Sequence, residues 1–134
     1  MTVRRRVSVT AFMNITDDET FGSDERGSAQ MTREVIVTDD VTEGIMHMEK
    51  GVGGEVRVEL DLNAIALSNS DVRIDGLARL FEGTSENTND LDGERNFNVL
   101  IPAGKFVSHV VNVRNDDEGG DHATITMNFR NRSA

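Results

Sequence analysis

Alternation of apolar and polar residues dominates this chain, and the 3.6-residue period of an amphipathic helix is nowhere sustained. In the clearest segment, Glu55–Leu67, apolar side chains point one way and mostly charged side chains the other. That arrangement is typical of an antiparallel strand with one face on a core and one face in water. Seven further segments carry the same pattern more or less strongly: Val3–Met13, Gln30–Thr38, Gly44–Glu49, Val72–Leu80, Phe97–Ile101, Phe106–Val113 and Ala123–Phe129.

Turn-forming residues separate these segments. The clearest turn signals are Thr38–Thr42, Gly51–Gly54, Ser68–Asp71 and Pro102–Gly104, the last of which holds the chain's one proline. Many short strands divided by such turns are typical of a sandwich or barrel. A chain of 134 residues fits one domain with a core large enough to need no disulfide. We therefore expect an all-β fold, a single eight-stranded antiparallel β-sandwich over residues 1–134.

Acidic residues gather in three of the predicted connections: Asn14–Gly27, Glu82–Glu94 and Arg114–Asp121. These hold 14 of the 24 carboxylates within 35 of the 134 residues, where even placement would put about 6. Successive connections in an antiparallel sandwich alternate between its two ends. The three acidic connections are the first, fifth and seventh, so they are predicted to share one end with the glycine turn Lys50–Gly54. The prediction requires the weakest segment, Gly44–Glu49, to be a strand. Without it, the first acidic connection would be separated from the other two.

Carboxylates crowded at one end repel one another unless a cation lies among them. Ca²⁺ is the leading candidate because the oxygen donors are many, cysteine is absent and only three histidines are present. Mg²⁺ usually takes fewer carboxylates and keeps more water. The alternative is a set of acidic loops that are merely solvated, since Asp, Asn, Gly and Ser are also turn formers. The candidate ligands are Asp18, Asp24 and Asp90, then Glu82 and Glu86, then Asp116, Asp117 and Asp121.

The spacing Asp18-x5-Asp24 resembles the first loop of C2 domains, the calcium- and lipid-binding β-sandwiches. In that family the second aspartate lies in a Gly-x-Ser-Asp motif, whereas Gly22-Ser23-Asp24 lacks the intervening residue and the following proline. The family's third loop, Asp-x-Asp-x5-Asp, is matched in part by Glu82-x-Thr84-x5-Asp90, with threonine in place of the central ligand. The resemblance implies a C2-like sandwich of the permuted (type II) topology that binds Ca²⁺.

Phe21 lies at the predicted tip of the first acidic loop. In a C2-like domain an apolar residue there can enter lipid, so the resemblance implies a possible Ca²⁺-dependent membrane contact. Burial of one such side chain contributes at most about 2–3 kcal/mol, which is too little alone for firm membrane binding.

Composition narrows the remaining function classes. A net charge of −10 argues against nucleic acid and against anionic lipid in the absence of Ca²⁺. We find no apolar run long enough to cross a membrane, no signal peptide and no enzyme motif. Cellular location stays open. The sequence thus favours a non-enzymatic calcium-binding module that orders its loops or bridges to a protein partner, a membrane or another copy. The alternative is a structural or assembly subunit of a virion, secretion apparatus or cell surface.

Overall fold

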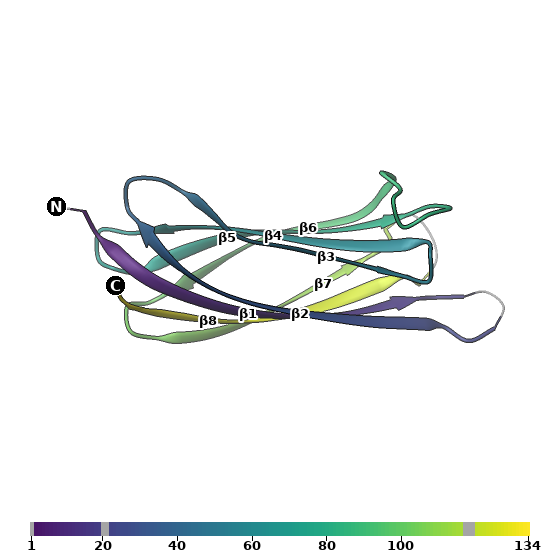
Figure 1. The fold of residues 1–134 in the computed structure, drawn as a ribbon, viewed down its shortest axis with the longest axis horizontal. Helices are drawn as coiled ribbons and strands as arrows, with labels where there is room; N and C mark the ends of the chain where they lie inside the picture. The colour runs from purple at the N-terminus through teal and green to yellow at the C-terminus, as the bar shows by residue number, and fades with distance from the viewer. Residues whose placement is uncertain (1, 20–21, 117–119) are drawn as a thin grey trace.

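The computed structural model describes residues 2–19, 22–116 and 120–134. All eight predicted strands are present, and the described residues contain no helix (Figure 1). The weakest prediction, Gly44–Glu49, lies within a strand of ten residues. The strands are β1 (Arg4–Asp17), β2 (Glu25–Thr38), β3 (Glu43–Val52), β4 (Val56–Ala66), β5 (Val72–Glu82), β6 (Leu91–Ile101), β7 (Phe106–Arg114) and β8 (His122–Ser133).

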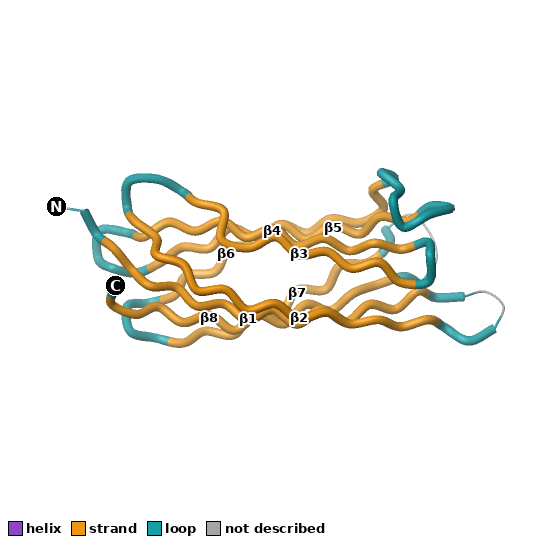
Figure 2. Tube along the Cα trace, viewed as in Figure 1, coloured by secondary structure: helices purple, strands orange, loops and turns teal. Residues whose placement is uncertain are grey.

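The strands form two antiparallel sheets of four, which lie face to face as two layers (Figure 2). Sheet A has the order β2-β1-β8-β7, and sheet B has the order β3-β4-β5-β6. The predicted all-β antiparallel sandwich is therefore confirmed. Each strand pairs with a neighbour in sequence, and β8 returns to pair with β1. This is a meander rather than the Greek key found in most β-sandwiches.

The core lies between the sheets and follows the alternation of the sequence. Inward positions of β1, β4, β5 and β8 are almost completely buried, as in Leu60, Leu62, Met127 and Phe129, each 0% exposed. Each such side chain contributes roughly 1.5–3 kcal/mol through removal of apolar surface from water. Among the residues that the structure describes, no helix has the length and hydropathy needed to span a bilayer.

The connections β1–β2, β3–β4, β5–β6 and β7–β8 lie together at one end of the molecule, opposite the chain termini (Figure 1). We call this the acidic end. Hydrogen bonds join its connections: the Asp18 N–H donates to Asp121 Oδ1 at 2.8 Å, and the Gly54 N–H donates to Glu86 Oε2 at 2.8 Å. The predicted meeting of the three acidic connections is thus confirmed. The strands extend further into the acidic connections than predicted: β1 continues through Asp17, and β6 begins at Leu91.

Candidate metal site at the acidic end

Four polar side chains close the core at the acidic end. In β1, β5, β7 and β8 the inward alternation continues one step beyond the last apolar residue, to Asp17, Glu82, Asn115 and Asp121. Asp17 is 2% exposed, Asp121 3% and Asn115 7%, and Glu82 is half-buried. We call these four residues the buried polar cluster. Three of them are carboxyls, so the cluster is strongly acidic and poorly hydrated.

Asp121 accepts hydrogen bonds from a neighbour of the buried polar cluster and from one of its members. Its Oδ1 accepts the Asp18 N–H at 2.8 Å, and its backbone carbonyl accepts the Asn115 N–H at 3.0 Å. The Asn115 side-chain amide donates to Glu82 Oε2. Asp17 Oδ2, in contrast, is buried and has no hydrogen-bond partner among the described residues. A buried ionised carboxylate without a partner is unfavourable by several kcal/mol, so this oxygen calls for a proton or a cation.

The pKa values of Asp17 and Glu82 are also raised, as expected where no positive charge offsets the buried carboxyls. Burial, and then the negative charge of Asp121, raise the pKa of Asp17 to about 7. Burial, and then a hydrogen bond with Asp121, raise the pKa of Glu82 to about 7. Two carboxyls share a hydrogen bond only when one of them is protonated, so the contact between Asp17 and Asp121 is favourable only while the pair holds a proton. A bound cation would take the place of that proton.

Glu19 and Glu55 complete a possible ligand set around Asp17. One carboxylate oxygen from each of the three residues lies within 4.8 Å of the other two. Oxygens that bind one Ca²⁺ ion at 2.3–2.6 Å lie at most about 5 Å apart, so a single ion can contact all three. Gly53 makes this approach possible: a Cβ there would lie 2.1 Å from Asp17 Oδ2, and its φ of +68° suits glycine.

Of the predicted ligands, Glu82 and Asp121 belong to the buried polar cluster, and Asp18 and Asp24 lie beside it. A hydrogen bond with Asp24, and then its charge, raise the pKa of Asp18. Asp24 also accepts the Glu19 N–H at 3.1 Å. These two aspartates therefore form an exposed outer pair next to the buried carboxyls.

The structure places Glu86, Asp90 and Asp116 elsewhere on the acidic end. Glu86 caps the β3–β4 turn through its bond to Gly54, and Asp90 accepts the Glu82 N–H through its backbone carbonyl at 3.1 Å. Asp116 forms two bonds with Arg95, at 3.0 and 3.1 Å, which lower the pKa of its carboxyl. Asp117 and Phe21 lie outside the described residues.

Four residues at the acidic end were not predicted as site residues from the sequence: Asp17, Glu19, Glu55 and Asn115. For Asp17 and Asn115 a signal was present, because the inward parity of their strands passes through both positions. Both were assigned to loops on account of the turn-forming residues that follow them. Glu19 is near Asp17 in the sequence, whereas Glu55 carries no such signal, since only the meeting of the β1–β2 and β3–β4 connections brings it near Asp17.

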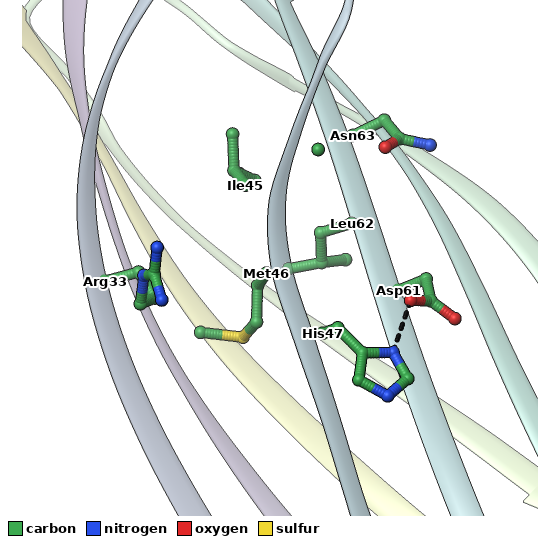
Figure 3. Close-up of a pocket in the computed structure, with 8 residues that line it drawn as sticks. Arg33, Ile45, Met46, His47, Asp61, Leu62 and Asn63 are labelled. Atoms are coloured by element: carbon green, nitrogen blue, oxygen red, sulfur yellow. Dashed lines mark hydrogen bonds and ion pairs between the residues drawn. The ribbon is translucent and has the colours of Figure 1, made fainter.

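A second group of charges lies on the outer face of sheet B (Figure 3). His47 Nδ1 is 2.6 Å from Asp61 Oδ1, and its Nε2 is 3.5 Å from Glu49 Oε2. These partners, Asp61 first, raise the pKa of His47. The group borders a hollow of about 260 Å³ between β2, β3 and β4, into which Arg33 also reaches. These side chains satisfy one another as exposed ion pairs.

A scan of protein-family models found no match to this chain, and a search of curated proteins found none either. The resemblance to C2 domains therefore stays a prediction. Function has to be inferred from the side chains at the acidic end.

Proposed function

We propose that the acidic end binds Ca²⁺ and that the protein is a non-enzymatic, calcium-binding β-sandwich module. One observation supports this most directly: Asp17 Oδ2 is buried among carboxyls without a hydrogen-bond partner in the described chain. A cation at this point would contact Asp17, Glu19 and Glu55 and would offset the negative charge of Asp121. Because the strands follow a meander order, support for Ca²⁺ binding comes from the contacts of Asp17, Glu19 and Glu55 and not from the resemblance to C2 domains.

The donor set favours Ca²⁺ over other ions. All the available side-chain donors in the ligand set are carboxylate oxygens. Ca²⁺ accepts six to eight such oxygens in an adaptable geometry, whereas Mg²⁺ requires a near-ideal octahedron and releases its water reluctantly. Zn²⁺ prefers nitrogen and sulfur donors.

Bound Ca²⁺ would connect the two sheets. Asp17 is the last residue of strand β1 in sheet A and Glu19 follows that strand, while Glu55 lies in the β3–β4 turn of sheet B. An ion held by all three would fix these connections relative to each other and would remove much of their mutual repulsion. Ordered, partly neutralised loops are a suitable surface for bridging to a partner.

Thermal melting tests the proposal directly. Melting temperature is measured at pH 7.5 in EGTA, in 1–10 mM Ca²⁺ and in the same concentrations of Mg²⁺. A ligand that binds only the native state stabilises it by RT ln(1 + [L]/Kd), about 2.7 kcal/mol at a hundredfold excess over Kd. For a domain of this size the expected rise is roughly 5–10 °C, with a smaller effect of Mg²⁺. Equal melting temperatures in EGTA and 10 mM Ca²⁺ would rule the proposal out.

A further inference from the structure

The outer face of sheet A has a charge opposite to that of the molecule. The register of β2, β1, β8 and β7 places one carboxylate, Glu34, among its outward side chains in the described part of the chain. The middle of the face is uncharged, with Phe12, Thr126 and Val110 side by side across three strands. Six arginines point outward from the same strands: Arg4, Arg6, Arg26, Arg114, Arg130 and Arg132. This surplus of arginine belongs to a chain with a net charge of −10.

Four of these arginines gather at the end of sheet A opposite the acidic loops, and we call them the arginine end. Arg6 pairs with Arg132 across β1 and β8, and both contact Glu34, at 3.3 and 2.8 Å. Arg4 and Arg130 are exposed and have no ion-pair partner among the described residues. Asp39 and Asp40 directly follow Thr38, the β2 partner of Arg4, but neither forms an ion pair with Arg4 or Arg130 among the described residues, so the arginine end keeps a surplus of positive charge.

Distance separates the carboxylates of the acidic end from these arginines. Along β1, Arg6 and Thr16 are ten residues apart, which corresponds to roughly 34 Å in an extended strand. The screening length at physiological salt is about 8 Å. The two groups of charges are thus electrostatically independent, and they lie at opposite ends of the long axis, the arginine end near the chain termini (Figure 1).

We propose that this chain self-associates head to tail, with the acidic end of one copy docked on the arginine end of the next. The complementary surface is on the chain itself, since 14 of its 24 carboxylates lie in the three acidic segments 14–27, 82–94 and 114–121, which meet at the acidic end. Two arginine ends repel each other, and so do two acidic ends, so the contact joins unlike surfaces. Contacts of this kind build open chains or closed rings.

An exposed aromatic side chain supports the choice of the arginine end as a contact surface. Phe106 is 62% exposed and lies directly across from Arg130 in the β7–β8 pair. Arginine and aromatic residues are enriched in protein interfaces. Phe106 would supply apolar burial between the charged contacts, while the arginines would set the orientation of the incoming acidic loops.

Sedimentation velocity in EGTA tests this independently of Ca²⁺ binding. In 25 mM NaCl the wild-type chain is expected to form larger species as its concentration rises, and 500 mM NaCl is expected to disperse them. The variant R4E/R130E removes two unpaired arginines and should weaken association by about tenfold or more. The control R73E/R79E makes the same charge change on the outer face of sheet B and should associate more strongly than R4E/R130E.

Mixing two variants gives the decisive result. R4E/R130E keeps an intact acidic end, and D24K/D90K keeps an intact arginine end. Each alone should remain largely monomeric, whereas an equimolar mixture should form a dimer through the one pair of intact surfaces. Melting curves establish that each variant is folded. A wild-type chain that stays monomeric at low salt, or a mixture that forms no dimer, would overturn the proposal.

Discussion

Asp17 occupies the last inward position of β1, where Val7, Val9, Ala11 and Met13 precede it in the same row of alternate residues. The alternation that builds the core therefore also carries a carboxyl into it. At the level of single residues, the acidic end is a place where folding forces Asp17, Glu82 and Asp121 together. Its chemistry follows from what relieves that crowding, which is either a proton or a cation.

The raised pKa values predict a stability that falls as pH rises. The carboxyls of Asp17 and Glu82 have ordinary values of 3.8 and 4.5, and the folded protein raises both to about 7. Between these values the native state binds more protons than the unfolded chain, so the contribution is complete at low pH and is lost through pH 7. In EGTA, the melting temperature should drop on the order of 5 °C or more from pH 5 to pH 8. A melting temperature that rises over this range would contradict the assigned burial of Asp17.

Replacing Asp17 with Asn separates the two ways of relieving the crowding. An amide of the same shape donates a hydrogen bond to Asp121 and carries no charge. In EGTA at pH 8 we expect Asp17→Asn to be more stable than the wild type by about 1–2 kcal/mol. Its Ca²⁺ affinity should fall by about tenfold or more. Asp40→Asn, at the opposite end, removes the same charge from an exposed position and should change neither quantity appreciably. An undiminished Ca²⁺ response of Asp17→Asn would show that the ion binds elsewhere.

At the level of elements, the β3–β4 turn shapes the candidate site. Its adjacent glycines both have positive φ, +68° at Gly53 and +75° at Gly54. They differ in their surroundings: a Cβ on Gly53 would overlap Asp17 Oδ2 and would lie 2.8 Å from Glu25 Oε2, while a Cβ on Gly54 would meet nothing within 4 Å. The turn thus combines one glycine required by conformation alone with one required also by the close approach of Asp17.

This pair of glycines predicts a graded response. Gly54→Ala should cost about 1 kcal/mol of folding stability, because only the left-handed backbone is affected. Gly53→Ala carries the same strain and must also displace the Asp17 carboxyl, so its cost should be roughly 2–3 kcal/mol or more. It should weaken Ca²⁺ binding as well, which Gly54→Ala should not do. Urea unfolding and Ca²⁺ titration of both variants measure these differences. Equal effects of the two substitutions would mean that Asp17 does not pack against the turn.

The strands and turns also show which parts of the fold could be predicted from the sequence. Alternation predicted all eight strands and, through their number, the shared position of the acidic connections. The predicted strands were too short, because Asp and Gly near their ends are also turn formers. In the structure, backbone pairing such as that of Asp17 with Glu25 extends β1 and β2. The three-dimensional neighbours of Asp17 depend on where two turns meet, and sequence periodicity contains no information about that.

The arginine end was also invisible in the sequence. Arg4, Arg6, Arg130 and Arg132 come from the two ends of the chain and converge only because β8 pairs with β1. At the level of the whole molecule, this pairing and the alternation of connections separate charge along the long axis. A single net charge of −10 therefore describes the protein poorly, because one end is crowded with carboxylates and one face is bordered by arginines.

Crowding at the acidic end predicts that salt stabilises the ion-free protein. In EGTA at pH 8, where the carboxyls of Asp17 and Glu82 are ionised, counterions screen their repulsion from neighbouring carboxylates. Raising NaCl from 20 to 500 mM should increase stability by about 1–2 kcal/mol, a melting shift of roughly 3–8 °C. The shift should be smaller at pH 5, where both groups are protonated, and smaller again in saturating Ca²⁺, which would already neutralise the cluster. A melting temperature that falls with NaCl would instead mean that the arginine ion pairs, such as Arg95 with Asp116, outweigh the repulsion.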